Sequence, residues 1–309
     1  MFALALSLVA AVASTHPLSA PPIVRRHDRP DSLYRNLARR FDAVGTIAQI
    51  GNATLIADRW AITAAHVARE MARTLRRPTV KFGAREYQIT AVYLQPQSDE
   101  SGTNDIALLR LATDVALVHP LKVYRDRSEA KQLAFLVGAG MSGLGNVRER
   151  DVDHELRAAT NVIDSADASA LYVSFDDPPN GTELEGAAGS GDSGGPAILV
   201  MGDVMYLVGV GSAGYDGVNG PASYGAIDIY TRVSSFASWI DDVMSEQFEP
   251  SWSRERGRLT RGAPPAAPHV LPVQSGAVVS TTGLGAAVRL RQSDPEESAQ
   301  TVYGSQCLR

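Results

Sequence analysis

The stretch AAGSGDSGGPA, residues 187–197, places a serine, Ser193, in an unusually open segment of backbone. Four glycines lie within seven residues, an aspartate directly precedes the serine, and a proline follows it three residues later. Ordering a glycine costs more conformational entropy than ordering any other residue, so this density is not typical of core packing. The stretch therefore indicates a functional loop, with Ser193 as its candidate nucleophile.

An isolated serine hydroxyl is a weak nucleophile and needs a base within hydrogen-bond reach, oriented by a third group. Among the six histidines, His66 ends the strand-like stretch RWAITAAH, whose small residues would let an imidazole project into a cleft. Asp105 begins the apolar stretch in TNDIALLRL, which would draw it toward the interior. Taken singly, each has a simpler interpretation: a surface or core histidine, and a turn aspartate that caps a strand.

Together, TAAH, NDIALLRL and GDSGGP, in that order, resemble the chymotrypsin/trypsin family of serine peptidases over about residues 41–245. The resemblance implies that Ser193 attacks the scissile carbonyl, His66 carries the proton, and Asp105 fixes the imidazole tautomer. It also implies that the backbone N–H groups of Gly191 and Ser193 form an oxyanion hole. The glycines would then let two main-chain donors point at one spot.

The same resemblance assigns substrate-binding residues. Ser212 matches the serine that supports the buried aspartate and precedes the substrate-binding backbone, in which Gly214 lies. Ala187 stands where the trypsin-type aspartate of the primary pocket would be. Asp228 and Tyr230 share one face of a strand by the period of two, so a carboxylate could line the other wall and receive Arg or Lys. The alternative is that Asp228 turns into the preceding loop and the pocket is apolar.

Family zymogens are activated when a cut exposes an Ile or Val amino group that pairs with the aspartate beside the serine. Here the expected pair is Asp192 with Ile23. Pro22 precedes Ile23, so a trypsin-like cut is not expected at that bond. The alternative is that Asp192 only orders the loop through backbone hydrogen bonds.

The only cysteine is Cys307, so no intramolecular disulfide and no cysteine-based metal site can form. The resemblance places the family's first disulfide at Gly51 and Val67, and Gly189 fills another cysteine position. We therefore expect the loops around the site to be held by packing alone.

Two alternatives to a peptidase follow from the same residues. GDSGG also fits the G-x-S-x-G pattern of lipases and esterases, but that elbow opens into a helix, and here a proline and a strand-like run follow. That family's order also needs a later histidine, and only His269 follows Ser193. The second alternative is a catalytically inert homologue that binds without cutting.

Composition limits the function classes. The chain has 309 residues, 44% hydrophobic, with a net charge of −5, which fits a globular protein and argues against nucleic acid as a partner. The first thirteen residues are apolar but too short to span a bilayer, and they indicate a secretory signal, with a buried helix as the alternative. We expect a secreted protein, extracellular or periplasmic, that needs neither cofactor nor metal and binds no membrane. Its expected partners are protein or peptide substrates and protein inhibitors.

Short apolar runs separated by turn residues predict an all-β fold, and the resemblance specifies two packed six-stranded antiparallel barrels with a C-terminal α-helix. A short helix is also expected in DSLYRNLARRF, capped by Asp31 or Ser32. The predicted segments are a signal peptide (1–20), an N-terminal pro/activation segment (21–40), an N-terminal β-barrel (41–127), a C-terminal β-barrel and helix (128–248) and a disordered tail (249–309).

Overall fold

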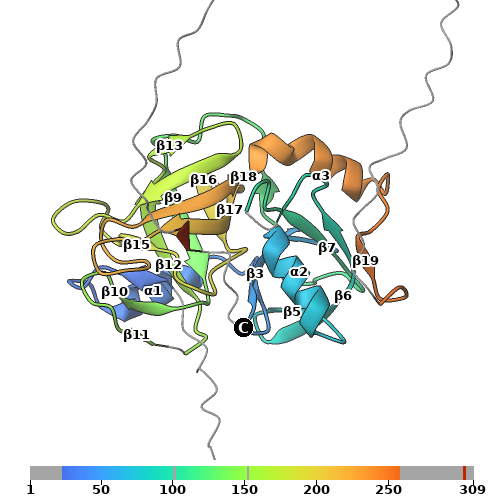
Figure 1. Ribbon diagram of the computed structural model, residues 1–309, viewed down its shortest axis with the longest axis horizontal. Helices are drawn as coiled ribbons and strands as arrows, with labels where there is room; N and C mark the ends of the chain where they lie inside the picture. The colour runs from blue at the N-terminus through green and yellow to red at the C-terminus, as the bar shows by residue number, and fades with distance from the viewer. Residues whose placement is uncertain (1–22, 100–101, 152, 258–301, 304–309) are drawn as a thin grey trace, which may run out of the picture.

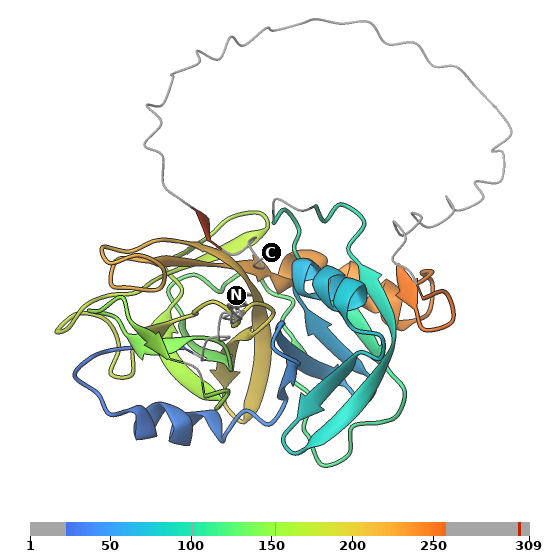
Figure 2. The same cartoon turned by 60° about the horizontal axis from the view of Figure 1, so that its bottom comes forward.

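A computed structural model describes residues 23–99, 102–151, 153–257 and the backbone of 302–303. Two β-structured units lie side by side, and each is seen separately in two views (Figures 1 and 2). The predicted all-β fold with a C-terminal helix is confirmed. The predicted signal peptide lies outside the described residues.

The first unit is a closed antiparallel barrel. Its strands are β2 (Val44–Ile47), β3 (Gly51–Ala57), β4 (Trp60–Thr63), β5 (Thr79–Phe82), β6 (Arg85–Leu94), β7 (Ala107–Leu111) and β19 (Trp252–Ser253). The order is β19-β6-β5-β2-β3-β4-β7, and a further pairing of β6 with β7 closes the ring. Its interior is filled by aliphatic side chains such as Leu55, Ile62 and Leu108, which are fully buried.

The second unit is an open sheet. Its strands are β8 (Lys122–Val123), β9 (Leu133–Gly138), β12 (Arg157–Val162), β13 (Ser165–Ala166), β14 (Ala170–Ser174), β16 (Pro196–Met201), β17 (Val204–Tyr215), β18 (Ile227–Arg232) and β20 (Val302–Tyr303). The order is β12-β9-β16-β17-β18-β14-β13, and both β8 and β20 pair with β17. Among the described residues no pairing joins β12 to β13, so the second barrel is a half-barrel rather than a closed one.

A small third sheet holds the N-terminal part of the described chain against the second unit. It has the order β11-β10-β1-β15, formed by β1 (Val24–Arg25), β10 (Ser142–Leu144), β11 (Arg150–Asp151) and β15 (Gly186–Ala187). Val24 pairs with Gly143 on one side and with Ala187 on the other. The N-terminal segment is therefore built into the fold close to the serine loop.

In the part of the chain that the structure describes, three α-helices accompany the sheets: α1 (Asp31–Ala38), α2 (Ala65–Thr74) and α3 (Ala237–Met244), the last preceded by the 3-10 turn η1 (Val233–Phe236). Helix α3 matches the expected C-terminal helix. Helix α2 was not expected, and it begins directly after β4 with Val67, Ala68 and Met71 on its buried face. None of the helices within the described ranges is long and apolar enough to cross a membrane.

Helix α1 forms where expected, but its predicted capping is wrong. Its N-cap is Pro30, and no side chain caps it. The carboxylate of Asp31 instead accepts hydrogen bonds from Arg157, at 2.6 and 2.8 Å, and from Arg35, at 2.6 Å. These ion pairs hold α1 against β12, beside which it lies in both views (Figures 1 and 2).

The predicted tail also needs correction. Residues 249–257 are ordered, with Ser251 and Trp252 buried and β19 paired to β6. The two-residue strand β20, near the end of the chain, also pairs with β17. Residues 258–301 and 304–309 lie outside the described part, where the prediction of disorder stays a prediction.

Candidate active site

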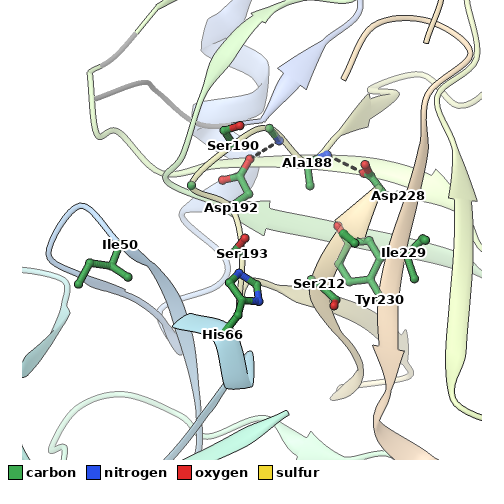
Figure 3. A pocket seen from close by; sticks show the side chains of 14 residues that line it. Ile50, His66, Ala188, Ser190, Asp192, Ser193, Ser212, Asp228, Ile229 and Tyr230 are labelled. Atoms are coloured by element: carbon green, nitrogen blue, oxygen red, sulfur yellow. Dashed lines mark hydrogen bonds between the residues drawn. The ribbon is translucent and has the colours of Figure 1, made fainter. Parts of the chain in front are cut away.

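A pocket opens where the two units meet, and both contribute to its wall (Figure 3). The first unit supplies Ile50 and His66. The second supplies three short segments: 188–193 from the serine loop, 211–213 from β17 and 228–230 from β18. The pocket thus brings together the histidine, the serine and the wall residues expected from sequence.

The imidazole of His66 is fixed by Asp105. His66 lies in the first turn of α2; its backbone N–H donates to Oδ1 of Asp105 at 2.9 Å, and its Nδ1 lies 2.6 Å from Oδ2. Asp105 precedes β7 and is 1% exposed, so the strand does draw it inward. Ser212 Oγ donates to the same Oδ2 at 2.6 Å, and Thr231 Oγ1 donates to the Asp105 carbonyl at 3.0 Å.

Asp105 is held as an anion. Burial raises the pKa of its carboxyl, but the hydrogen bond and charge of His66 and the hydrogen bond from Ser212 outweigh burial and keep that pKa below the usual value. An ionised carboxylate only accepts hydrogen bonds, so Nδ1 of His66 carries the proton. This tautomer leaves Nε2 unprotonated and able to accept a proton.

Ser193 lies beside His66, and their side chains are neighbours in the pocket wall (Figure 3). The loop that carries Ser193 uses left-handed backbone at Gly191, with φ +86°, and at Gly194, with φ +77°. A Cβ on Gly194 would approach Thr63 Oγ1 to 2.2 Å, so a larger residue cannot be accommodated there. Within the described ranges, the N–H groups of Gly191 and Ser193 donate to no protein acceptor.

The serine loop is clamped by Asn52, a residue that sequence reasoning missed. Asn52 is fully buried at the start of β3. Its backbone N–H donates to the Ser193 carbonyl at 2.8 Å, and its Nδ2 donates to the Gly191 carbonyl at 2.9 Å. Its Oδ1 accepts from the N–H of Ala139 at 3.1 Å. In the sequence, Asn52 stands out only as part of an N-x-[ST] sequon, and its burial excludes glycosylation of the folded chain.

Gly51 and Val67, which stand where the resemblance places the family's first disulfide, are close-packed. A Cβ on Gly51 would meet the Ser193 carbonyl oxygen at 2.7 Å and Val67 Cγ2 at 2.9 Å. The chain segments therefore approach as closely as backbone atoms permit. The hydrogen bonds of Asn52, in addition to packing, hold them there.

Asp192 and Ile23 are brought together as expected. The backbone nitrogen of Ile23 lies 2.9 Å from Oδ2 of Asp192, which also accepts from Gly189 at 2.8 Å, while Oδ1 accepts from Gly140 at 2.7 Å. Both Ile23 and Asp192 are buried. Burial raises the pKa of the Asp192 carboxyl to about 6, against the lowering effect of the three N–H donors.

The far wall of the pocket contains Asp228. Its Oδ2 accepts a hydrogen bond from the Ala188 N–H at 2.6 Å, and both residues line the pocket, as does Tyr230 (Figure 3). Ala187 itself lies in β15, 1% exposed, and is not among the lining residues. Gly214 lies one residue beyond the lining segment of β17 and pairs with Asp228 across the strands.

A family model described as Trypsin matches residues 38–240. The chain belongs to the trypsin family. This membership agrees with the fold described above.

Several trypsin-family proteins are similar in sequence. Serine protease Hayan of Drosophila melanogaster is 32% identical over 242 residues, 66% of this chain and 36% of that protein. CLIP domain-containing serine protease B4 of Anopheles gambiae is 31% identical, over 47% of this chain and 42% of that protein. Trypsin of Phaedon cochleariae is 31% identical, over 61% of this chain and 76% of that protein. The chain thus spans less than half the length of two of these relatives.

A solved structure gives the same fold. Neuropsin, a serine protease expressed in the limbic system of mouse brain, aligns with a TM-score of 0.54 over 72% of this chain and 100% of its own, at 21% identity. Within the described ranges, no group of three or more His, Cys, Asp or Glu residues is arranged to hold a metal ion.

Proposed function

We propose that this trypsin-family chain is a secreted serine endopeptidase in which Ser193, His66 and Asp105 act as one catalytic unit. The observation that carries the proposal is the buried, ionised Asp105 bonded to Nδ1 of His66, with Ser193 beside the imidazole. A weak nucleophile acquires a base in this arrangement, and the base acquires an orienting group.

The reaction follows from the positions of the donors and acceptors. Nε2 of His66 takes the proton of the Ser193 hydroxyl as Oγ bonds to the scissile carbonyl carbon. The carbonyl oxygen becomes an oxyanion, which the N–H groups of Gly191 and Ser193 would stabilise; one such donor lowers a barrier of this kind by roughly 3–4 kcal/mol. His66 then gives its proton to the leaving amine, and the acyl-enzyme is hydrolysed by water with the same proton transfers.

Substrate preference is proposed from Asp228. A carboxylate in the pocket wall would receive the cationic head of Arg or Lys, while the neighbouring Ala188 leaves room for the side chain. The hydrogen bond from the Ala188 N–H fixes the Asp228 carboxylate in the pocket wall. This supports the interpretation in which Asp228 lines the pocket over the one in which it turns into the preceding loop. We therefore propose cleavage after Arg or Lys, with looser selectivity than an enzyme whose anion lies at the base of the pocket.

Activation is proposed to involve Ile23 and Asp192. The nitrogen of Ile23 already lies at the Asp192 carboxylate, and Ile23 has φ +33°, a left-handed conformation that β-branched residues avoid. A cut before Ile23 would remove this strain, because φ ceases to be constrained when the preceding peptide bond is gone. It would also replace an N–H donor by an ammonium group, giving an ion pair.

The catalytic proposal is tested by labelling with a fluorophosphonate probe, on the chain beginning at Ile23, with Ser193→Ala as the paired variant. We expect labelling of the wild type and none of Ser193→Ala. An unlabelled wild type that is folded by circular dichroism would identify an inert homologue. The lipase alternative is disfavoured because strand β16, not a helix, follows the serine loop.

The specificity proposal has a conservative test in Asp228→Asn, which keeps an oxygen acceptor for the Ala188 N–H but removes the charge. We expect kcat/KM for substrates with Arg or Lys before the cut to fall by about 100-fold, the loss of a charge-assisted contact of about 3 kcal/mol. Substrates with Phe or Leu at that position serve as controls and should change little. Equal losses on both substrate classes would show that Asp228 shapes the pocket without selecting cations.

A further inference from the structure

One edge of β17 borders the pocket. From Val204 to Val210 this strand pairs with β16, and from Gly209 to Tyr215 its other side pairs with β18. Beyond Gly211, whose N–H donates to Gly195, β16 has left the edge, and Ser212 and Ala213 line the pocket. An open strand edge presents main-chain N–H and C=O groups that pair readily with another extended chain.

The strand that pairs there comes from the C-terminal end of the same chain. Strand β20 is antiparallel to β17, with Tyr303 opposite Gly214 and Val302 opposite Tyr215. It is the dark red arrow beside β17 in Figure 1. From Val302 to Tyr303, the opposing residue on β17 changes from Tyr215 to Gly214. Ser212 lies two residues beyond Gly214 in the same direction.

That direction leads toward the catalytic residues. Ser212 donates its hydroxyl hydrogen bond to Asp105, and it lines the same pocket as Ser193 and His66. An extended peptide added to this edge in the orientation of β20 therefore approaches the triad along β17. A peptide substrate that reaches Ser193 by the same edge cannot occupy it at the same time.

We propose that strand β20, Val302–Tyr303, is a built-in competitor of peptide substrates, which binds by strand addition to the edge of β17. The inference rests on the proposed endopeptidase function. Strand addition derives its affinity from main-chain hydrogen bonds, so the segment needs no special sequence to compete with a substrate. Its contact is intramolecular, and this gives it an advantage over a free peptide.

The connecting segment is long enough for this contact within one molecule. Residues 258–301 lie between the ordered end of the first unit and β20. At about 3.3 Å per residue, a chain of that length reaches well over ~100 Å when extended. A covalent connection raises the effective concentration of β20 at the edge of β17 above that of a free peptide, which lets a weak strand pairing compete with substrate.

The test uses the full chain from Ile23 to Arg309 and a double variant, Val302→Pro with Tyr303→Pro. Proline has no N–H to donate and is excluded from paired strand positions.

The matched control is Val278→Pro with Val279→Pro, the same change in the same tail but outside β20. With a chromogenic peptide substrate, we expect the β20 variant to lower KM by about 10-fold at unchanged kcat, because a competitor has been removed. The control should behave as the wild type, and the wild-type KM should not depend on enzyme concentration. Equal KM values for all three chains would overturn the proposal.

A second readout does not need activity. Cys307 is the only cysteine, so a thiol-reactive fluorophore labels the tail selectively in a Ser193→Ala background. We expect lower fluorescence anisotropy in the β20 variant than in the control variant, because the tail is released from β17. If no chain turns over substrate while the anisotropy difference persists, the proposed function has failed and the tail contact stands. Equal anisotropy in the two variants overturns the contact. If mass spectrometry shows that the tail is cleaved off only when Ser193 is present, its role as a competitor is overturned.

Discussion

Asn52 contributes to the site although it belongs to none of the three catalytic motifs. A single buried side chain, together with its own backbone, makes hydrogen bonds to Gly191, Ser193 and Ala139, and so fixes the loop from which the proposed oxyanion donors project. Its role exists only because β3 and the serine loop, far apart in sequence, meet in the folded chain. Sequence motifs located the catalytic candidates, because each of them lies in a distinctive local stretch.

Replacing Asn52 should affect both stability and turnover. Asn52→Ala leaves the N–H of Ala139 without its acceptor in a partly buried position, and we expect the free energy of unfolding to fall by about 1–3 kcal/mol. Because the loop carrying Gly191 is also released, we expect kcat to fall by about 10- to 100-fold at temperatures where the variant is folded. Urea denaturation and initial rates give the two quantities. Asn180→Ala, at an exposed asparagine, is the control and should change neither; a variant that loses stability at full kcat would limit Asn52 to a structural role.

At the scale of elements, the strands with dense apolar runs were predictable and the polar or small-residue elements were not. Strands such as β6, β7, β16 and β18 coincide with apolar runs flanked by turn residues. Strand β12, RAATNV, has few large apolar residues, and its place is set by pairing with β9. Helix α2 was hidden because its alanine- and arginine-rich sequence directly follows the histidine motif, and only tertiary packing shows which face is buried.

Helix α1 illustrates an element held in place by charge. Arg157 is 3% exposed and bonds to both Asp31 and Asp153, while Arg35, at the helix surface, contacts the same two carboxylates. Burial lowers and the two carboxylates raise the pKa of Arg157, with a net increase, so the guanidinium is always charged. Asp31 and Asp153 correspondingly have pKa values below the usual range, against the raising effect of burial.

This arrangement predicts unequal effects of two arginine substitutions. Arg157→Met should lower the free energy of unfolding by about 3 kcal/mol, because it leaves two carboxylates without their buried partner. Arg35→Met should cost less than about 1 kcal/mol, as is usual for exposed pairs. The carboxylates of Asp31 and Asp153 stabilise the fold fully above their unfolded pKa, near 3.8, and this contribution is lost as pH falls through their lower folded-state pKa values. Because Arg157→Met already lacks most of this contribution, it should lose less stability than the wild type on acidification below about pH 4. Equal costs for the two variants, measured by urea denaturation, would contradict the assignment of Arg157 as the anchor.

At the scale of the whole molecule, the Ile23–Asp192 contact links the N-terminal segment to the catalytic loop. The folded-state pKa of Asp192, about 6, lies above its ordinary value of 3.8, so the protonated form is favoured by folding. The protonated Asp192 carboxyl therefore contributes fully to the free energy of unfolding below about pH 4, and this contribution is lost as pH rises through about 6. At about 1.4 kcal/mol per pH unit, the difference amounts to about 3 kcal/mol.

Cleavage before Ile23 should reverse this pH dependence. In the uncut chain, stability relative to its Asp192→Asn variant should fall between about pH 4 and pH 6. In the chain beginning at Ile23, the ammonium group favours the ionised carboxylate, and stability relative to Asp192→Asn should rise or stay level over the same range. Urea denaturation in a Ser193→Ala background, which prevents self-digestion, gives the four curves. Parallel curves for cut and uncut chains would mean that no ion pair forms.

The close approach of Gly51 to the serine loop has a consequence for the environments in which this protein can work. Since the walls of the site meet through backbone contacts and the amide of Asn52, and the single thiol of the chain lies far along the sequence at Cys307, no bond near the triad can be broken by a reductant. Dithiothreitol or glutathione should leave the geometry of the site untouched. The folding of the site therefore does not depend on the redox state of its surroundings, and an expression host needs no oxidative folding machinery to produce the chain.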